Sequence, residues 1–113
     1  MRTIFDMASL HLSIPAHEAL ELLGSAIRAN RIRKRWSSEE LAERVGVSRA
    51  TISKVEHGDA TVAIGTYFEA ALLVGIDLFG DGASRHRMVA NKRDELVLLP
   101  ATARRRKRID DDF

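Results

Sequence analysis

The sequence predicts an all-α fold, with enough chain for one small domain and short extensions. Its 113 residues can bury a single hydrophobic core and little more. Between residues 17 and 75, apolar side chains recur at the spacing of one helix face. Serines precede several of these stretches and glycines follow them, as expected for short capped helices.

The composition is that of a soluble globular protein, with 45% hydrophobic and 30% charged residues. No apolar run approaches the roughly 18 residues of a membrane-spanning helix. The first residues lack the basic start and continuous apolar core of a signal peptide. Cysteine is absent, which excludes disulfides and thiolate metal sites. We therefore expect a cytoplasmic protein with no membrane association.

The first helix is expected over residues 17–35, after an N-terminal arm formed by residues 1–17. The arm shows no sustained period, and Pro15 breaks any helix before it. Leu20, Leu23 and Ile27 then recur on one helix face. Basic residues close the C-terminal end, where cations suit the helix dipole.

Two short helices follow. The sequence SSEE at 37–40 predicts a helix start, with Ser37 or Ser38 as the N-cap and acids in the first turn. Gly46 ends this helix. Ser48 is a natural N-cap for the next one, over residues 49–57, which ends at Gly58.

The strongest helical stripe lies in the fourth segment, which ends at Gly75. It consists of Ile64, Tyr67, Phe68, Ala71 and Leu72. The following IDLFG (76–80) is expected to form a short turn of helix that closes the core with Ile76, Leu78 and Phe79.

The pattern weakens after Gly82. Residues 84–96 fit a helix, but 88–89 and 96–99 also fit edge strands. We expect residues 81–100 to be a dimerisation or linker segment. Residues 101–113, which hold five cations and three anions, are expected to be a disordered tail.

Residues 37–58 together have the pattern of a helix-turn-helix. Ala42 is small where two crossing helices must nearly touch, and Gly46 lies at the bend, where a positive φ is needed. Only Ile52 and Val55 anchor the second helix, so its other face is free to enter a major groove. The alternative is a helical hairpin whose Arg49 and Lys54 are merely solvent-facing charges.

The helix-turn-helix interpretation assigns DNA-contacting residues. Arg49 can fork onto guanine O6 and N7, and an alanine or a threonine methyl can contact a thymine methyl. The expected base-reading residues are Arg49, Ala50, Thr51, Ser53 and Lys54. The expected phosphate contacts are Arg33, Lys34, Arg35, Ser38 and Ser48. Trp36 fits packing between helices better than stacking on a base.

Charge supports a polyanion partner without requiring one. Residues 28–35 contain five basic residues and no acid, and five more cations lie at 104–108. Such blocks are typical of nucleic-acid binders, but they also occur on solvated helix faces and tails.

Residues 22–80 resemble the XRE-type (Cro and C1 repressor) DNA-binding domain. The resemblance lies in LGSAIRANRIRKRWSSEELAERVGVSRATISKVEHGDA and in YFEAALLVGIDL. It implies a five-helix, lambda-repressor-like domain at 18–80 and a transcriptional repressor that binds a palindromic operator as a homodimer. The family often has glutamine at the position of Ser38.

The ending LLPATARRRKRIDDDF is similar to the tails of HipB-type antitoxins, which are encoded beside HipA-like kinase toxins. That resemblance implies an autoregulating antitoxin of a toxin–antitoxin operon, with Phe113 and Asp112 as candidate docking residues. The alternatives are a stand-alone phage-type or metabolic repressor, and a solvated tail.

No chemistry-bearing constellation accompanies these motifs. The four histidines form no pair at helical metal-ligand spacing, and no nucleophile elbow or phosphate-binding glycine loop occurs. We expect no metal, no cofactor and no enzyme activity. RNA binding is disfavoured because the six aromatic residues lie mostly on the apolar stripes.

Overall fold

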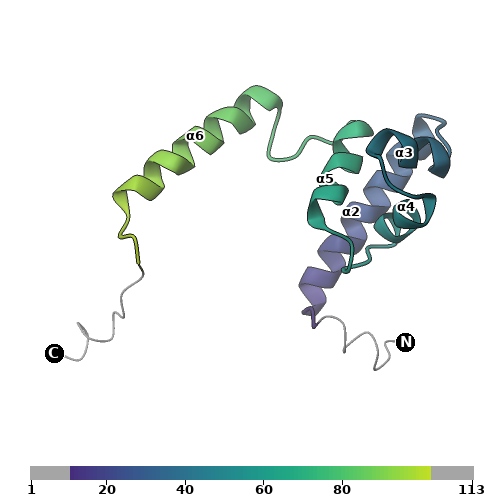
Figure 1. Cartoon of the computed structure of the whole chain (residues 1–113), viewed down its shortest axis with the longest axis horizontal. Helices are drawn as coiled ribbons and strands as arrows, with labels where there is room; N and C mark the ends of the chain where they lie inside the picture. The colour runs from purple at the N-terminus through teal and green to yellow at the C-terminus, as the bar shows by residue number, and fades with distance from the viewer. Residues whose placement is uncertain (1–10, 103–113) are drawn as a thin grey trace. The chain divides into compact units, whose positions relative to one another are not determined.

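The computed structural model describes residues 11–102, shown in colour in Figure 1. This part of the chain contains helices and loops and no strand, so the all-α prediction is confirmed. The five helices are α2 (Ile14–Arg33), α3 (Ser38–Val45), α4 (Arg49–Glu56), α5 (Ile64–Leu73) and α6 (Gly82–Leu98). Residues 103–113 of the predicted tail and residues 1–10 of the predicted arm lie outside the described residues.

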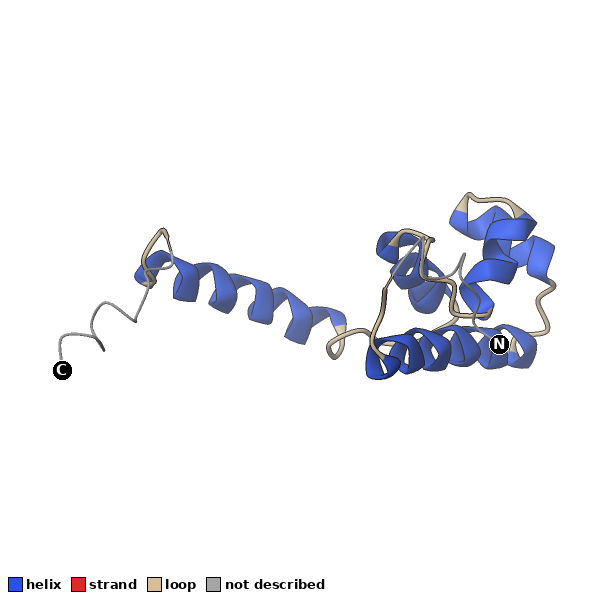
Figure 2. Cartoon of the chain, turned by 90° about the horizontal axis from the view of Figure 1, so that it is seen from below, coloured by secondary structure: helices blue, strands red, loops and turns tan. Residues whose placement is uncertain are grey.

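The chain forms two compact units that divide between Leu78 and Phe79. The first contains α2 to α5, and the second contains α6. In the first unit, α3 packs on α4 and α5, and α2 packs on α4 and α5. Figure 2 shows the long α2 running along one side of the shorter helices of its unit.

The core of the first unit draws on all four of its helices. The largest fully buried side chains are Tyr67, Ile27, Leu41, Ile52 and Val55. Leu20 and Leu23 pack against this core from the same face of α2 as Ile27, as their spacing predicts. At about 25 cal/mol per Å² of buried apolar surface, these side chains supply the main driving force for folding.

Helix α2 begins and ends earlier than expected. Ser13 is its N-cap, with its Oγ accepting the Ala16 N–H at 3.3 Å, and Pro15 lies in the first turn, where its missing N–H costs nothing. The helix ends at Arg33 because Arg35 takes the left-handed conformation, with φ 63°.

The core-facing side of α5 differs from the predicted stripe. Tyr67 and Ala71 are buried, but Ile64 and Leu72 are exposed, and Ala70 completes the face instead. A stripe defined by side-chain size misplaces this face because two alanines make the close contacts.

The segment after α5 corrects a second expectation. Residues 76–80 form no turn of helix. Ile76 and Leu78 pack against the core as expected, but Phe79 has φ 60° and is 69% exposed, so it does not close the core.

Residues 82–98 form a helix and not a pair of edge strands. Asp81 is the N-cap, its Oδ1 accepting the Ser84 N–H at 2.8 Å, and this hydrogen bond lowers the pKa of the Asp81 carboxyl. None of the residues of α6 is buried. Its exposed apolar residues, together with Leu99 behind it, are Met88, Val89, Leu96, Val97, Leu98 and Leu99.

Candidate nucleic-acid interface

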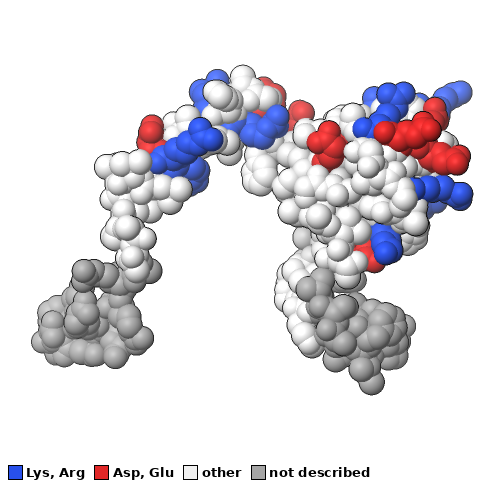
Figure 3. Space-filling model, viewed as in Figure 1, with Lys and Arg blue, Asp and Glu red and all other residues white. Residues whose placement is uncertain are grey.

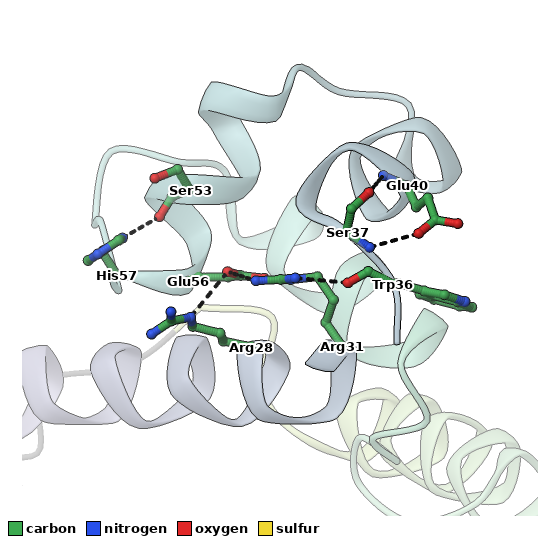
Figure 4. Close-up of polar contacts among 8 residues, drawn as sticks. All are labelled: Arg28, Arg31, Trp36, Ser37, Glu40, Ser53, Glu56 and His57. Atoms are coloured by element: carbon green, nitrogen blue, oxygen red, sulfur yellow. Dashed lines mark hydrogen bonds and ion pairs between the residues drawn. The ribbon is translucent and has the colours of Figure 1, made fainter. Parts of the chain in front are cut away.

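The N-terminus of α3 is held by a capping box. Ser37 is the N-cap: its Oγ accepts the Glu40 N–H at 3.0 Å, and the Glu40 carboxylate accepts the Ser37 N–H at 2.8 Å (Figure 4). This settles the choice between Ser37 and Ser38. The two reciprocal bonds satisfy two donors that a helix start otherwise leaves unpaired.

The turn between α3 and α4 depends on Gly46. Its φ of 91° lies in the left-handed region, and a Cβ there would meet no atom within 4 Å. Backbone conformation, not lack of space, therefore favours glycine at this position. The carbonyl of the buried Ala42 accepts the N–H groups of both Gly46 and Val47, at 2.8 and 3.0 Å, which closes α3 tightly.

Helix α4 is anchored on one side only. Ile52 and Val55 are fully buried, and Glu56 is nearly so. Ser48 is the N-cap, its Oγ accepting the Thr51 N–H at 3.1 Å. A short helix with so narrow a buried face presents most of its surface outward.

The predicted base-reading residues lie on that outward surface. Arg49, Ala50, Ser53 and Lys54 are exposed. Thr51 is half-buried, and its hydroxyl lies 3.0 Å from the Ser48 hydroxyl, so the hydroxyl takes part in the helix cap. Its methyl group is the part that remains for the predicted contact with a thymine methyl. Their contacts with bases stay predictions.

The predicted phosphate-contacting residues lie in two places. Arg33, Lys34 and Arg35 are exposed at the C-terminal end of α2, where Arg33 donates to the Asn30 side chain at 2.7 Å. Ser38 is half-buried at the start of α3, and Ser48 is exposed but engaged in its cap. Figure 3 shows basic and acidic side chains intermingled on the α3 side of this unit.

A buried ion pair behind α4 was not anticipated. Arg31 donates to Glu56 through Nε at 2.6 Å and Nη2 at 3.0 Å, and its Nη1 donates to the Trp36 carbonyl at 2.9 Å (Figure 4). The Arg31 and Glu56 side chains are 11% and 5% exposed. The hydrogen bond to Glu56 raises the pKa of Arg31.

This pair fixes the C-terminal end of α4 against α2 and the α2–α3 turn. Arg28 adds a longer contact, with its Nε 4.0 Å from Glu56. Of the five basic residues counted at 28–35, Arg31 is therefore buried and not available to a polyanion. The available signal was position: Arg31 continues the core-facing spacing of Leu23 and Ile27.

Two glycines bring backbones together at the same junction. A Cβ on Gly24 would lie 2.3 Å from the Val55 carbonyl oxygen, and one on Gly58 would lie 2.8 Å from the Cα of Glu21. Helix α2 and the end of α4 therefore meet through main chain, with no room for a methyl group. The orientation of α4 is thereby fixed by backbone contact as well as by the ion pair.

The C-terminal end of α4 is also fixed by local hydrogen bonds. His57 is the C-cap, one residue before the predicted end of this helix, and its Nδ1 lies 2.7 Å from the Ser53 carbonyl oxygen (Figure 4). Tyr67 donates its hydroxyl to the Asp59 carbonyl at 2.7 Å, and burial with the nearby Asp59 charge raises the pKa of Tyr67 to about 12. The Thr61 hydroxyl and N–H donate to the Asp59 carboxylate and lower its pKa.

Trp36 packs against the core, as expected, and is half-buried. Two cations lie over its ring: the Lys34 Nζ is 5.2 Å and the Arg44 Cζ is 4.2 Å from the ring centroid. Arg44 was not among the residues predicted from sequence.

The two residues predicted to dock a partner cannot be placed in the structure. Phe113 and Asp112 lie outside the described residues. Within residues 11–102, no three metal-binding side chains cluster, and no helix is long and apolar enough to cross a membrane.

Comparison with known proteins agrees with this geometry. Residues 27–79, a little under half of the chain, match the family model described as helix-turn-helix. No curated protein matches the sequence. The matched segment contains the C-terminal part of α2 from Ile27 on, both helices of the motif and all of α5. The matched helix-turn-helix family is a DNA-binding regulatory family and not an enzyme family. The match supports a DNA-binding transcription regulator of the XRE type.

Proposed function

We propose that this protein is a sequence-specific transcriptional repressor that binds a palindromic operator as a homodimer. The observation that carries the proposal is the asymmetry of α4, which has a narrow buried side and an outward face of Arg49, Ala50, Ser53 and Lys54. In this proposal α4 enters the major groove, and the basic end of α2 at 33–35 contacts the phosphate backbone.

The homodimer follows from the length of the motif. One recognition helix reads only a few base pairs, so proteins of this kind pair across half-sites about one turn of DNA apart. The apolar residues of α6 are the proposed interface, because a 17-residue helix with no buried residue is marginal in water on its own.

Base reading is tested by substituting Arg49. Arg49→Ala should weaken binding to an operator selected from random DNA by about 1–3 kcal/mol and remove the preference at one base pair. The matched control is Arg33→Gln, which should weaken all sequences alike and lower the salt slope by about one unit. Equal losses on operator and random DNA for Arg49→Ala would exclude it as a base reader.

We propose further that the repressor is the antitoxin of a HipA-like kinase toxin and autoregulates their operon. This rests on the sequence of the C-terminal tail. Deleting residues 109–113 should abolish toxin binding while nearly preserving operator affinity, because the five cations at 104–108 remain. Unchanged toxin binding, or no stoichiometric partner in a pull-down from the native host, favours the alternative of a stand-alone repressor.

A further inference from the structure

The α2–α3 turn and helix α3 carry three cations that form no ion pair within the described residues. Within residues 11–102 the ion pairs are Arg28–Glu56, Arg31–Glu56 and Lys92–Glu95, none of which includes Lys34, Arg35 or Arg44. All three of these side chains are exposed. No acid of α3 forms an ion pair with them, and the Glu40 carboxylate accepts the Ser37 N–H.

Arg35 occupies a conformation that disfavours arginine. Its φ of 63° is left-handed, and it follows the C-cap of α2, where glycine is the usual residue. The Trp36 N–H bonds to the Arg31 carbonyl at 3.1 Å across this turn, so the conformation is fixed by the helix end. A non-glycine residue there lowers stability, and no contact of the Arg35 side chain within the described residues offsets that loss.

Lys34 and Arg44 come from different elements and converge on one ring. Lys34 is the C-cap residue of α2, and Arg44 lies in the last turn of α3. Both lie over Trp36, whose contact with the core fixes the ring. Cation–π contact orients the two charges while leaving their N–H donors free for an anion.

We propose that Lys34, Arg35 and Arg44, organised around Trp36, form a DNA-backbone site that binds phosphodiester groups beside the recognition helix. The site consists of the α2–α3 turn and a residue of α3, the first helix of the motif, and that helix crosses the sugar–phosphate backbone in helix-turn-helix complexes. The inference rests on the DNA-binding function proposed above. It adds Arg44 and Trp36 to the contact surface and gives a reason for an arginine at a glycine-like position.

Opposite effects on folding and binding test the proposal. Arg35→Gly should raise the thermal midpoint by a few degrees, because it relieves the left-handed residue, yet weaken DNA binding several-fold. Arg44→Gln removes an exposed cation–π contact, so it should lower the midpoint slightly, and it should also weaken binding. Each should lower the slope of log K against log salt by about one unit, equally on selected and random-sequence duplexes.

Trp36→Leu and Arg87→Gln complete the set. Trp36→Leu keeps an apolar group against the core but removes the ring. DNA affinity should therefore fall, while the slope of log K against log salt should fall less than in Arg35→Gly or Arg44→Gln, because no charge is removed. Arg87, an exposed cation of α6 that donates to the Ser84 hydroxyl, is the matched control, and its substitution should change neither slope nor midpoint. Affinity is measured by fluorescence anisotropy on labelled duplexes across a salt series.

The outcomes separate this inference from the function on which it rests. A wild-type chain that binds no duplex would overturn both. Wild-type binding with unchanged slopes in Arg35→Gly and Arg44→Gln would overturn the backbone site alone. A lower thermal midpoint in Arg35→Gly would show that Arg35 does not reduce the stability of the fold, and it would contradict the reason given for an arginine at this position.

Discussion

The α2–α5 unit and α6 use the same helical secondary structure in different ways. Every helix of the first unit buries residues against the others, including an arginine and a glutamate. Helix α6, nearly as long as α2, buries none and exposes most of its large apolar side chains. The first unit is stabilised by its own core, whereas the apolar side chains of α6 are left exposed, and this exposure supports the dimerisation proposed above.

The ion pairs of the two regions provide the strongest contrast. Glu56→Ala should lower the free energy of unfolding by about 3–5 kcal/mol, because it leaves Arg31 buried with only the Trp36 carbonyl as a partner. Glu95→Ala in α6 removes an ion pair of similar length, 3.0 Å, whose side chains are 73% and 56% exposed. It should cost less than about 1 kcal/mol. Urea unfolding followed by circular dichroism measures both.

A double substitution sharpens this result. Arg31→Met with Glu56→Leu replaces the buried charges by apolar groups and should recover most of the stability lost in Glu56→Ala. Equal losses from Glu56→Ala and Glu95→Ala would show that burial does not distinguish the two pairs.

Glycines provide a matched test of how tightly the first unit is packed. Gly24→Ala should cost about 1–3 kcal/mol or more, because the added Cβ meets the Val55 carbonyl 2.3 Å away. Gly65→Ala in α5 is the control: a Cβ there meets nothing within 4 Å, so the substitution should stabilise the helix by about 0.5–1 kcal/mol. Thermal or urea unfolding gives both values, and equal signs would contradict the contact.

We expect a smaller, pH-dependent effect on stability from Asp59, in the loop after α4. The hydrogen bonds from Thr61 lower the pKa of Asp59 in the folded state. The stabilisation is therefore present above its unfolded pKa, near 3.9, and is lost as the pH falls through the lower folded value. Wild type should exceed Asp59→Asn in stability at neutral pH, and the difference should vanish in strong acid. An NMR titration of the Asp59 carboxyl checks the direction of the shift.

Removing α6 should affect the stability of the first unit least of all. A chain that ends at Gly80 should keep nearly the full thermal midpoint, because α6 contributes no buried residue. The same chain should sediment as a monomer and bind operator DNA roughly 10²–10⁴-fold more weakly, since two linked half-site contacts are lost. A tight dimer without α6 would place the interface in the first unit or in the arm.

Features that depend on residues close together in sequence were predictable. Ser48 caps α4 through a hydrogen bond three residues away, and Gly46 ends α3 because its own φ is positive. Ile52 and Val55 were identifiable as the buried side of α4 from spacing alone. The predicted helix-turn-helix depends on such local preferences, which explains why the sequence by itself determined it.

Only the tertiary structure decided the contacts between distant residues. Arg31 and Glu56 are 25 positions apart, and their pairing depends on how α2 crosses α4. That crossing also explains Gly24, whose close contact with the Val55 carbonyl no local pattern reveals. Spacing shows which residues of one helix share a face, but the depth and angle of packing depend on backbones that meet from separate parts of the chain.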